Sequence, residues 1–264
     1  MGRHPIVALL TDFGLQDHYV GVMKGVMLGI CPSASIVDIT HDVPAQDVLA
    51  GAFELAAAFS YFPQGTTFVA VVDPGVGSSR LAIAAEAGGY RFVGPDNGIF
   101  SLVFRRHAPD RVVELSDPRF LLPNISRTFE GRDRFAPAAA WLSEGADLAR
   151  MGPPIHEWVR LAIPEPHVLD DSIDGAVIKV DRFGNLITNI DRATLNLLAA
   201  PATRVEVAGT VIEGLIPSYA HAPAGQLCAL VSSADFLEIA CARGSAFSLL
   251  DAGVGAPVHV TAGA

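Results

Sequence analysis

The run Phe68–Arg80 combines the residue types of a chemical site, because a carboxylate, two glycines and a guanidinium follow an apolar stretch. The apolar residues predict a buried strand, and Asp73 comes at its carboxyl end, where an α/β sheet presents side chains to a ligand. Gly75 and Gly77 would let the backbone turn tightly and approach a bound molecule. Arg80 is long enough to fold back onto Asp73. The spacing therefore predicts an acid and a guanidinium held together at a binding site.

The same glycines could belong to a dinucleotide-binding loop, since Gly75-Val76-Gly77 follows a predicted strand. That fingerprint also needs a third glycine and an immediate helix. Here the chain continues with two short apolar runs separated by Gly88-Gly89, a pattern typical of a strand pair. The sequence therefore argues against a dinucleotide-binding loop.

Other polar residues follow predicted strands in the same way. Asp12 follows the apolar run Ile6–Leu10 and is a second candidate ligand group. His41 follows the run Ser35–Ile39, and two roles remain open for it, a hydrogen-bonded loop histidine or a catalytic one. Apolar spacing predicts the intervening helices, which cover residues 22–30, 47–62 and 135–142.

The order of these elements predicts an α/β domain with a largely parallel sheet over residues 1–165. Prolines at 153–154 and at 164 and 166 indicate a linker. Residues 170–264 consist of short alternating runs rich in β-branched residues, separated by turn-forming residues. This texture predicts a smaller C-terminal β-barrel domain.

Composition narrows the function classes. The chain has 264 residues, half of them hydrophobic, and a formal net charge of -10 without basic clusters, which argues against nucleic acid as a partner. No apolar run is long enough for a membrane helix or a signal peptide, so we expect a cytoplasmic protein. The three cysteines are widely spaced among apolar neighbours and predict reduced core residues. The histidines lack metal-ligand spacing, so no metal site is expected.

Six motifs taken together resemble one family, the S-adenosylmethionine hydroxide adenosyltransferases, which are relatives of the fluorinase and chlorinase. The motifs are Thr11–Gly14 (TDFG), Thr40–Asp42 (THD), Asp73–Gly77 (DPGVG), Pro95–Gly98 (PDNG), Gly131–Pro137 (GRDRFAP) and Asp181–Asn185 (DRFGN). The resemblance implies an α/β domain followed by a β-barrel. It also implies a homotrimer, with the substrate between the α/β domain of one subunit and the barrel of its neighbour.

The implied reaction is cleavage of S-adenosylmethionine by water at the ribose C5′, giving adenosine and methionine without a cofactor. A sulfonium is already a good leaving group, so the protein must mainly place a water in line with sulfur and accept its proton. Asp73 and Arg80 match two members of the family's Asp-Arg-His set. The chain departs at the third member, because Glu130 occupies the place of the histidine.

Three orientations of Glu130 remain open. It could point toward Asp73, so that two carboxylates share one guanidinium and one of them serves as the base. It could instead pair rigidly with Arg80 and leave the water without its holder. It could also point to solvent from a mobile loop.

The resemblance also assigns substrate contacts. Asp12 matches the ribose-binding carboxylate, and Asp17 and Asp181 would meet the methionine ammonium group. Phe183 and Asn185 match the barrel loop that stacks on adenine and hydrogen-bonds its edge. The remaining matches, which provide a backbone clamp for the base, are Ser245 and Ala246.

Two alternative functions stay open. The first is a protein that binds S-adenosylmethionine and has lost turnover through the exchange of histidine for Glu130. The second is a halogenase, against which the charge of Asp73 and Glu130 argues. Like charges about 4 Å apart cost roughly 4 kcal/mol at an effective dielectric constant near 20, unless Arg80 cancels the repulsion.

Overall fold

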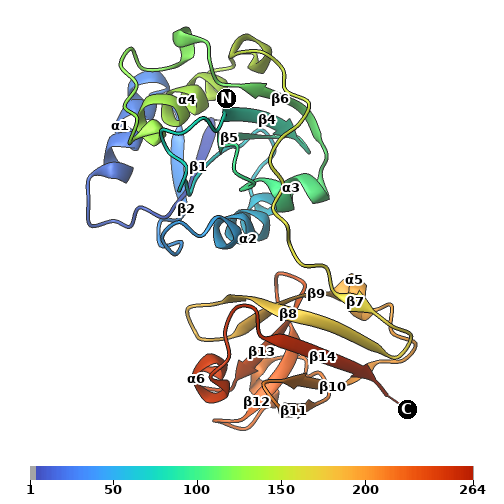
Figure 1. The fold of residues 1–264 in the computed structure, drawn as a ribbon. Coiled ribbons are helices and arrows are strands. Elements are labelled where there is room, and N and C mark those ends of the chain that lie inside the picture. Colours follow the sequence, from blue (N-terminus) through green and yellow to red (C-terminus); the bar gives the residue numbers. More distant parts are fainter. Residues whose placement is uncertain (1–3, 264) are drawn as a thin grey trace. The chain divides into compact units, whose positions relative to one another are not determined.

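The computed structural model describes residues 4–263 and divides the chain into two compact units (Figure 1). The α/β unit ends at Leu161, and the barrel unit begins at Ala162. The predicted fold class, an α/β domain followed by a β-barrel, is confirmed.

The α/β unit is built on a six-stranded sheet with the order β2-β1-β3-β5-β4-β6. Its strands are β1 (Ile6–Thr11), β2 (Ser35–Thr40), β3 (Thr67–Val71), β4 (Ala82–Ala87), β5 (Tyr90–Pro95) and β6 (Pro109–Glu114). Its helices are α1 (Tyr19–Ile30), α2 (Val48–Ala58), α3 (Ser101–Arg106) and α4 (Ala136–Ser143). β2, β1, β3 and β5 pair in parallel, whereas β4 is antiparallel to both of its neighbours. The expected strand pair around Gly88-Gly89 is therefore the β4–β5 hairpin.

Helices cover both faces of this sheet (Figure 1). The strands are apolar at successive positions, so alternate residues enter opposite cores. On one face, Val7 and Leu9 pack in a cluster with Met23 of α1 and Ala139 of α4. On the other face, α2 and α3 cover aromatic residues such as Phe92, whose ring lies 5.8 Å from the ring of Phe100. Burial on both faces explains why these strands lack a polar alternation.

The parallel strands place four chemically interesting residues at one edge of the sheet. Their carboxyl ends lie side by side, and the first polar residues beyond them are His41 after β2, Asp12 after β1, Asp73 after β3 and Asp96 after β5. Because the strand order is β2-β1-β3-β5, these residues follow one another along the edge in that order. This is the edge at which open α/β sheets bind ligands.

The barrel unit is an antiparallel sheet of eight strands with the order β11-β10-β14-β8-β9-β13-β12, and β7 pairs with β8. Its strands are β7 (His167–Val168), β8 (Ser172–Val180), β9 (Leu186–Asp191), β10 (Ala202–Val207), β11 (Thr210–Glu213), β12 (Leu227–Val231), β13 (Phe236–Cys241) and β14 (Pro257–Ala262). Two short helices accompany them, α5 (Arg192–Leu195) and α6 (Ala246–Leu250). Beyond β11, Ile216 N–H donates to the Ala229 carbonyl oxygen of β12, which nearly closes the barrel.

The three cysteines confirm the expectation of reduced core residues. Cys31, Cys228 and Cys241 are free thiols, and all three are buried. Burial raises the pKa of the Cys31 and Cys228 thiols, which disfavours their reactive thiolate form. Within residues 4–263, no helix is both long enough and apolar enough to span a membrane.

Candidate active site

Asp73 and Arg80 form the pair that the sequence predicts. Arg80 Nε donates to Asp73 Oδ1 at 2.9 Å, and Arg80 Nη2 donates to Asp73 Oδ2. Their side chains are only 5% and 10% exposed. Burial acts to lower the pKa of Arg80, but the hydrogen bonds and charges of Asp73 and Glu130 raise it above its usual value. The guanidinium therefore stays charged in a site largely removed from water.

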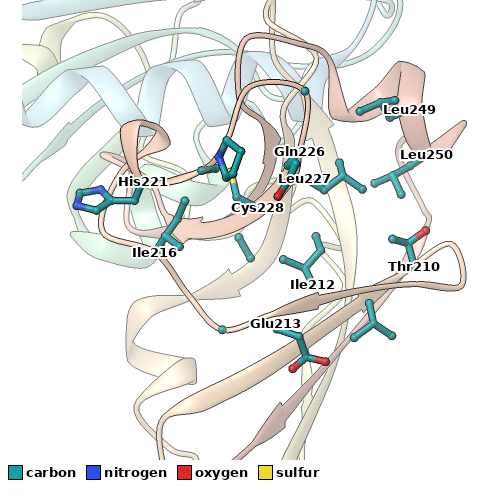
Figure 2. A pocket seen from close by; sticks show the side chains of 16 residues that line it. Thr210, Ile212, Glu213, Ile216, His221, Gln226, Leu227, Cys228, Leu249 and Leu250 are labelled. Atoms are coloured by element: carbon teal, nitrogen blue, oxygen red, sulfur yellow. The ribbon is translucent and has the colours of Figure 1, made fainter.

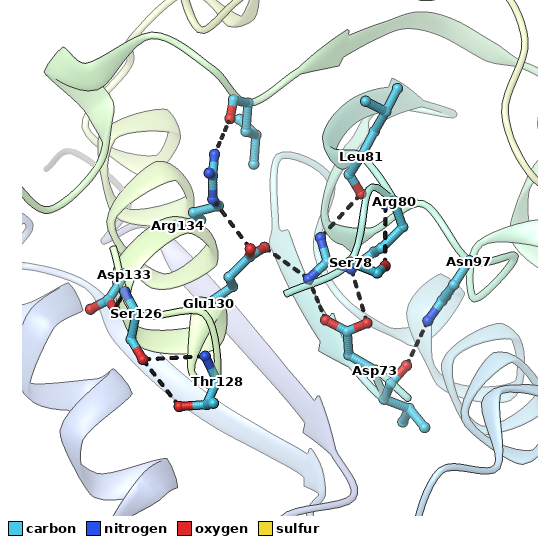
Figure 3. A network of polar contacts seen from close by, with 12 residues as sticks. Asp73, Ser78, Arg80, Leu81, Asn97, Ser126, Thr128, Glu130, Asp133 and Arg134 are labelled. Carbon is cyan, nitrogen blue, oxygen red and sulfur yellow. Dashed lines mark hydrogen bonds and ion pairs between the residues drawn. The ribbon is translucent and has the colours of Figure 1, made fainter. Parts of the chain in front are cut away.

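Glu130 joins this pair from a distant part of the chain (Figure 3). Arg80 Nη2 donates to Glu130 Oε2 at 2.8 Å, so one guanidinium nitrogen contacts both acids. On the far side, Arg134 Nε lies 3.6 Å from Glu130 Oε1. The side chain of Glu130 is 11% exposed, so the expectation of a solvent-facing residue is wrong. The contacts combine the other two orientations, a shared guanidinium near Asp73 and a direct pair with Arg80.

The fold fixes Glu130 because its segment is not an open loop. Glu130 precedes a π-helical turn, Gly131–Phe135, which continues directly into α4. The buried Asp133 carboxylate accepts from Ser126 N–H at 2.7 Å and from Arg132 Nε at 2.6 Å. Single π turns widen a helix locally and often occur at functional sites. The sequence predicts a helix only from residue 135, so this earlier helical start is a correction.

Three segments of the chain pack closely at the site: the turn of Gly77, residues 127–130, and the loop of Asp12 and Phe13. Gly77 has φ +76°, and a Cβ there would lie 2.3 Å from the Arg127 carbonyl oxygen, so only glycine lets these segments meet. Gly75 is less constrained, because a Cβ there would make no contact shorter than 3.4 Å. The Phe129 ring lies 5.9 Å from that of Phe13, which links the Glu130 segment to the loop of Asp12.

Asp12 lies beside this group and is oriented by the loop that follows β2. Gln46 N–H donates to Asp12 Oδ2 at 2.8 Å, and Gln46 itself adopts a left-handed backbone with φ 66°. Asp12 Oδ1 is the oxygen left for a ligand or solvent. Asp17 lies in the same loop, five residues after Asp12, and is exposed. Among residues 4–263, we find no hydrogen bond or ion pair that orients its side chain.

Asp96 is a further acid at the same edge, in the family motif Pro95–Gly98, to which the sequence assigns no contact with the substrate. Asp96 Oδ1 accepts from Val159 N–H at 2.9 Å. Burial raises the pKa of Asp96, although that hydrogen bond and the charge of Arg80 act in the opposite direction. Asp96 N–H donates to the Leu81 carbonyl oxygen at 2.9 Å, and Arg80 Nη1 donates to the same oxygen, so Asp96 lies near the central pair. No local pattern distinguishes this acid from an ordinary turn residue.

In the barrel unit, Asp181, Phe183 and Asn185 form one tight hairpin loop between β8 and β9. Asp181 Oδ1 accepts from the backbone N–H groups of Phe183 and Asn185, each at 2.8 Å, and Asp181 Oδ2 accepts from Asn185 Nδ2 at 3.0 Å. Asn185 is buried, whereas Phe183 is 75% exposed. The loop therefore uses its acid internally and presents its aromatic ring outward, as a stacking surface requires.

Ser245 and Ala246 pack against that loop. The Ser245 hydroxyl caps α6 by accepting from Ser248 N–H at 3.1 Å. A Cβ on Gly184 would lie 2.1 Å from Ser245 Oγ, and Phe247 N–H donates to the Gly184 carbonyl oxygen at 2.9 Å. The structure therefore places all the predicted barrel residues in one cluster.

A buried acid near this cluster was not foreseen from the sequence. The Tyr219 hydroxyl donates to Glu238 Oε1 at 2.6 Å, and Glu238 is 4% exposed. Burial raises the pKa of Glu238, and the nearby charge of Asp181 adds to this shift. Burial and Glu238 also raise the pKa of Tyr219. Glu238 occupies an outward position of a strand pattern, which ordinarily indicates a solvated residue.

A cavity of about 590 Å³ lies elsewhere on the barrel unit (Figure 2). Ile212, Leu249 and Leu250 line it together with polar residues such as Glu213 and Gln226. None of the predicted substrate-binding residues of the barrel lines this cavity, so we do not assign the substrate to it. In the part of the chain from residue 4 to residue 263, no group of three or more histidine, cysteine or acidic side chains is arranged to hold a metal ion.

Comparison with known proteins agrees with both units. The model of the SAM hydroxide adenosyltransferase N-terminal domain matches residues 7–152, and that of the C-terminal domain matches residues 175–259. An (R)-S-adenosyl-L-methionine hydrolase of Thermus thermophilus is 40% identical, over 96% of this chain and 98% of its own. A fluorinase of Nocardia brasiliensis is 30% identical, over 90% of this chain and 91% of its own.

A solved structure also has the same fold as this chain. A conserved protein of Thermotoga maritima superposes with a TM-score of 0.90 at 36% identity, covering 97% of this chain and 99% of its own. The two domain models together account for most of the sequence in the expected order. The chain therefore belongs to the SAM hydroxide adenosyltransferase family.

Proposed function

We propose that the protein hydrolyses S-adenosylmethionine to adenosine and methionine. The observation that carries this proposal is the buried group of Asp73, Arg80 and Glu130 at the carboxyl edge of a parallel sheet. Membership of the family and the hydrolase activity named for the Thermus thermophilus relative support it. The acid of the central pair supplies a group that can receive the proton of an attacking water.

The proposed reaction is an in-line displacement. The oxygen of water forms a bond to C5′, and the bond between C5′ and sulfur breaks, with its electron pair remaining on sulfur as the methionine thioether. One proton of the water stays in the new 5′-hydroxyl group and the other passes to a carboxylate. No general acid is needed, because the sulfonium leaves without protonation.

Within this scheme, Asp73 hydrogen-bonds the water and receives its proton, and Arg80 fixes the Asp73 carboxylate through two parallel contacts. Glu130 fixes Arg80 from the other side, and Arg134 offsets part of the charge of Glu130. Placing the water in this way can contribute a large part of the rate, because both reactants are held at the geometry of attack.

The substrate contacts of the proposal come from both units. Asp12 holds the ribose diol with its carboxylate, and Asp17 meets the methionine ammonium group. Phe183 stacks on adenine, while Asn185 and the backbone at Ser245 and Ala246 hydrogen-bond its edge. Asp181 was also assigned to the ammonium group, and that role must coexist with the three hydrogen bonds it already accepts within its loop.

One observation favours a second candidate, a binding protein without turnover. Arg80 donates to Asp73, to Glu130 and to the Leu81 carbonyl oxygen, so few of its N–H groups remain for a water. This candidate predicts stable binding of S-adenosylmethionine by calorimetry without products, and cleavage restored by Glu130→His.

The charge of the site does not decide whether water or a halide is the nucleophile. Arg80 and Arg134 both lie near the two acids, so the repulsion expected for a halide is largely offset. The assay must therefore include chloride and fluoride, and a 5′-halogenated nucleoside would replace the hydrolase assignment by a halogenase.

The proposal includes a homotrimer in the cytoplasm, with the substrate between one subunit's α/β unit and its neighbour's barrel. This part rests on the family resemblance, and light scattering in solution tests the subunit number. For the reaction itself, the protein is incubated with S-adenosylmethionine in a chelating buffer without added cofactor. Adenosine and methionine should appear in equal amounts, whereas no adenosine at any pH would refute hydrolysis.

A further inference from the structure

His41 is buried at the edge of the sheet and connects the two loops that surround Asp12. His41 Nδ1 lies 2.8 Å from the Thr11 hydroxyl oxygen, and both residues are almost fully buried. The same hydroxyl accepts from Phe13 N–H at 3.2 Å, and Gly14 N–H donates to the His41 carbonyl oxygen at 2.8 Å. The residues on both sides of Asp12 are therefore tied to His41.

The other ring nitrogen of His41 faces an acid. His41 Nε2 lies 3.1 Å from Asp38 Oδ1 without the alignment of a hydrogen bond. Lys24 Nζ donates to Asp38 Oδ2 at 2.7 Å. Although partial burial acts to raise it, the pKa of Asp38 lies below its usual value because Lys24 and His41 favour the carboxylate. A charged acceptor therefore stands beside Nε2.

This arrangement selects one tautomer of the ring. A carboxylate only accepts hydrogen bonds, so the proton of a neutral His41 belongs on Nε2, and Nδ1 accepts from the Thr11 hydroxyl group. The Thr11 oxygen is then free to accept from Phe13 N–H. These polar atoms form a directed chain of hydrogen bonds from Phe13 through Thr11 to His41, and the Asp38 charge beside Nε2 orients the ring.

Asp12 lies between Thr11 and Phe13, two residues that these hydrogen bonds connect. The loop that begins at His41 also brings Gln46 N–H to Asp12 Oδ2. We propose that His41 is a positioning residue, which orients the Asp12 carboxylate toward the ribose of a nucleoside through Thr11 and through its own loop. The inference rests on the proposed function, because it takes the ribose as the partner of Asp12.

A double-mutant cycle tests this role. The intact protein, His41→Phe, Asp12→Asn and the double variant are compared for adenosine binding by calorimetry, and for KM and kcat with S-adenosylmethionine. His41→Phe should weaken binding about tenfold, the usual size of an effect from one broken buried hydrogen-bond network. KM should rise by a similar factor, with a smaller change in kcat. In the Asp12→Asn background, His41→Phe should weaken binding no further.

Two variants of Thr11 and one control variant distinguish a specific loss of binding from misfolding. Thr11→Val removes the hydroxyl group and should reproduce the binding defect, whereas Thr11→Ser keeps it and should restore binding. Thr66→Val is the control, because the buried Thr66 hydroxyl also makes a hydrogen bond, to the Pro63 carbonyl oxygen at 2.7 Å, but lies before the amino end of β3, away from Asp12. It should bind adenosine like the intact protein.

The outcomes separate this inference from the proposed function. If the intact protein binds adenosine but produces none from S-adenosylmethionine, hydrolysis is refuted while the binding cycle still decides the role of His41. Equal losses in both backgrounds, or a loss no larger than that of Thr66→Val, would show that His41 does not act through Asp12. No adenosine binding by the intact protein would overturn the inference as well.

Discussion

Asp73 and Glu130 in the α/β unit and Glu238 in the barrel unit are all buried carboxylates, but their partners differ in charge. The first two share the Arg80 guanidinium, and Arg134 lies beside the second. Glu238 accepts from the neutral Tyr219 hydroxyl group, and the charge that acts on it is that of another acid, Asp181. One unit surrounds its buried acids with cations, whereas the other raises the pKa of its buried acid.

On the proposed function, this difference separates the residues that carry out the chemistry from those that recognise the substrate. A carboxylate that receives a proton from water must be charged beforehand, and the α/β unit supplies cations for that state. The barrel cluster contributes an exposed aromatic ring and a self-contained turn, which suit the neutral face of a base. The predictions below test this division, beginning with the largest expected effect.

Asp73→Asn should abolish most of the activity while leaving binding largely intact. The amide keeps the shape of the side chain but cannot receive a proton, so kcat should fall by about 10²–10⁴-fold. Asp117→Asn is the control, because Asp117 and Arg119 form a similar two-contact pair at the surface. Adenosine formation at saturating substrate gives the comparison. An Asp73→Asn protein as active as the Asp117→Asn protein would remove the chemical role of the α/β unit.

Phe183→Ala should change affinity more than rate. Stacking on a base contributes about 1–3 kcal/mol, so KM and the adenosine dissociation constant should rise by about 5- to 160-fold. Tyr61→Ala serves as control, since Tyr61 is an equally exposed aromatic residue of the α/β unit, 80% exposed. A fall in kcat at unchanged KM would contradict a purely recognising barrel.

Glu130→Gln distinguishes positioning from proton transfer. Glutamine still accepts a hydrogen bond from Arg80 but carries no charge and cannot act as a base. If Glu130 only positions Arg80, kcat should fall about tenfold, the size of a lost charge-assisted contact. A loss as large as that of Asp73→Asn would assign the proton to Glu130. Glu86→Gln provides the control, because Glu86 pairs with Arg91 at 3.9 Å on β4 and β5.

Glu238→Gln should stabilise the barrel unit without affecting chemistry. The folded state raises the pKa of Glu238 above its ordinary value of 4.5, so the folded protein prefers the protonated acid. Stability from this residue is therefore complete below that ordinary value and is lost as pH rises through the raised pKa. Glutamine cannot ionise and still accepts from Tyr219, so it should gain about 1 kcal/mol at neutral pH.

Thermal unfolding at several pH values checks this last prediction. The gain of Glu238→Gln over the intact protein should be largest at neutral pH and should disappear as the solution becomes acidic. Glu206→Gln, on an exposed position of β10, should show no such trend. A gain that does not depend on pH would mean that folding does not raise the pKa of Glu238.

The sequence predicts what is local in this molecule. Asp73 and Arg80 are seven residues apart, and Asp181–Asn185 form one turn, so spacing and residue type suffice to group them. An α/β domain with a largely parallel sheet, followed by a β-barrel, also follows from the apolar patterns along the chain. These features depend on neighbours along the chain, which a single sequence displays directly.

Long-range contacts escape the sequence. Glu130 lies 50 residues from Arg80, and its orientation depends on the π turn and on the contact between Gly77 and Arg127. The raised pKa values of Asp96 and Glu238 depend on burial by segments that are distant in sequence. Such features arise only when the chain has folded, because neither burial nor a distant partner leaves a local pattern.

The central claim is that Asp73 and Arg80 direct water onto the ribose carbon that sulfur leaves. The most direct measurement is turnover in water labelled with heavy oxygen, followed by mass spectrometry of both products. The account predicts one heavy oxygen in the 5′-hydroxyl group of adenosine, unlabelled methionine, and loss of this product in Asp73→Asn. Adenosine without the label, or labelled adenosine formed at the same rate by Asp73→Asn, would contradict it.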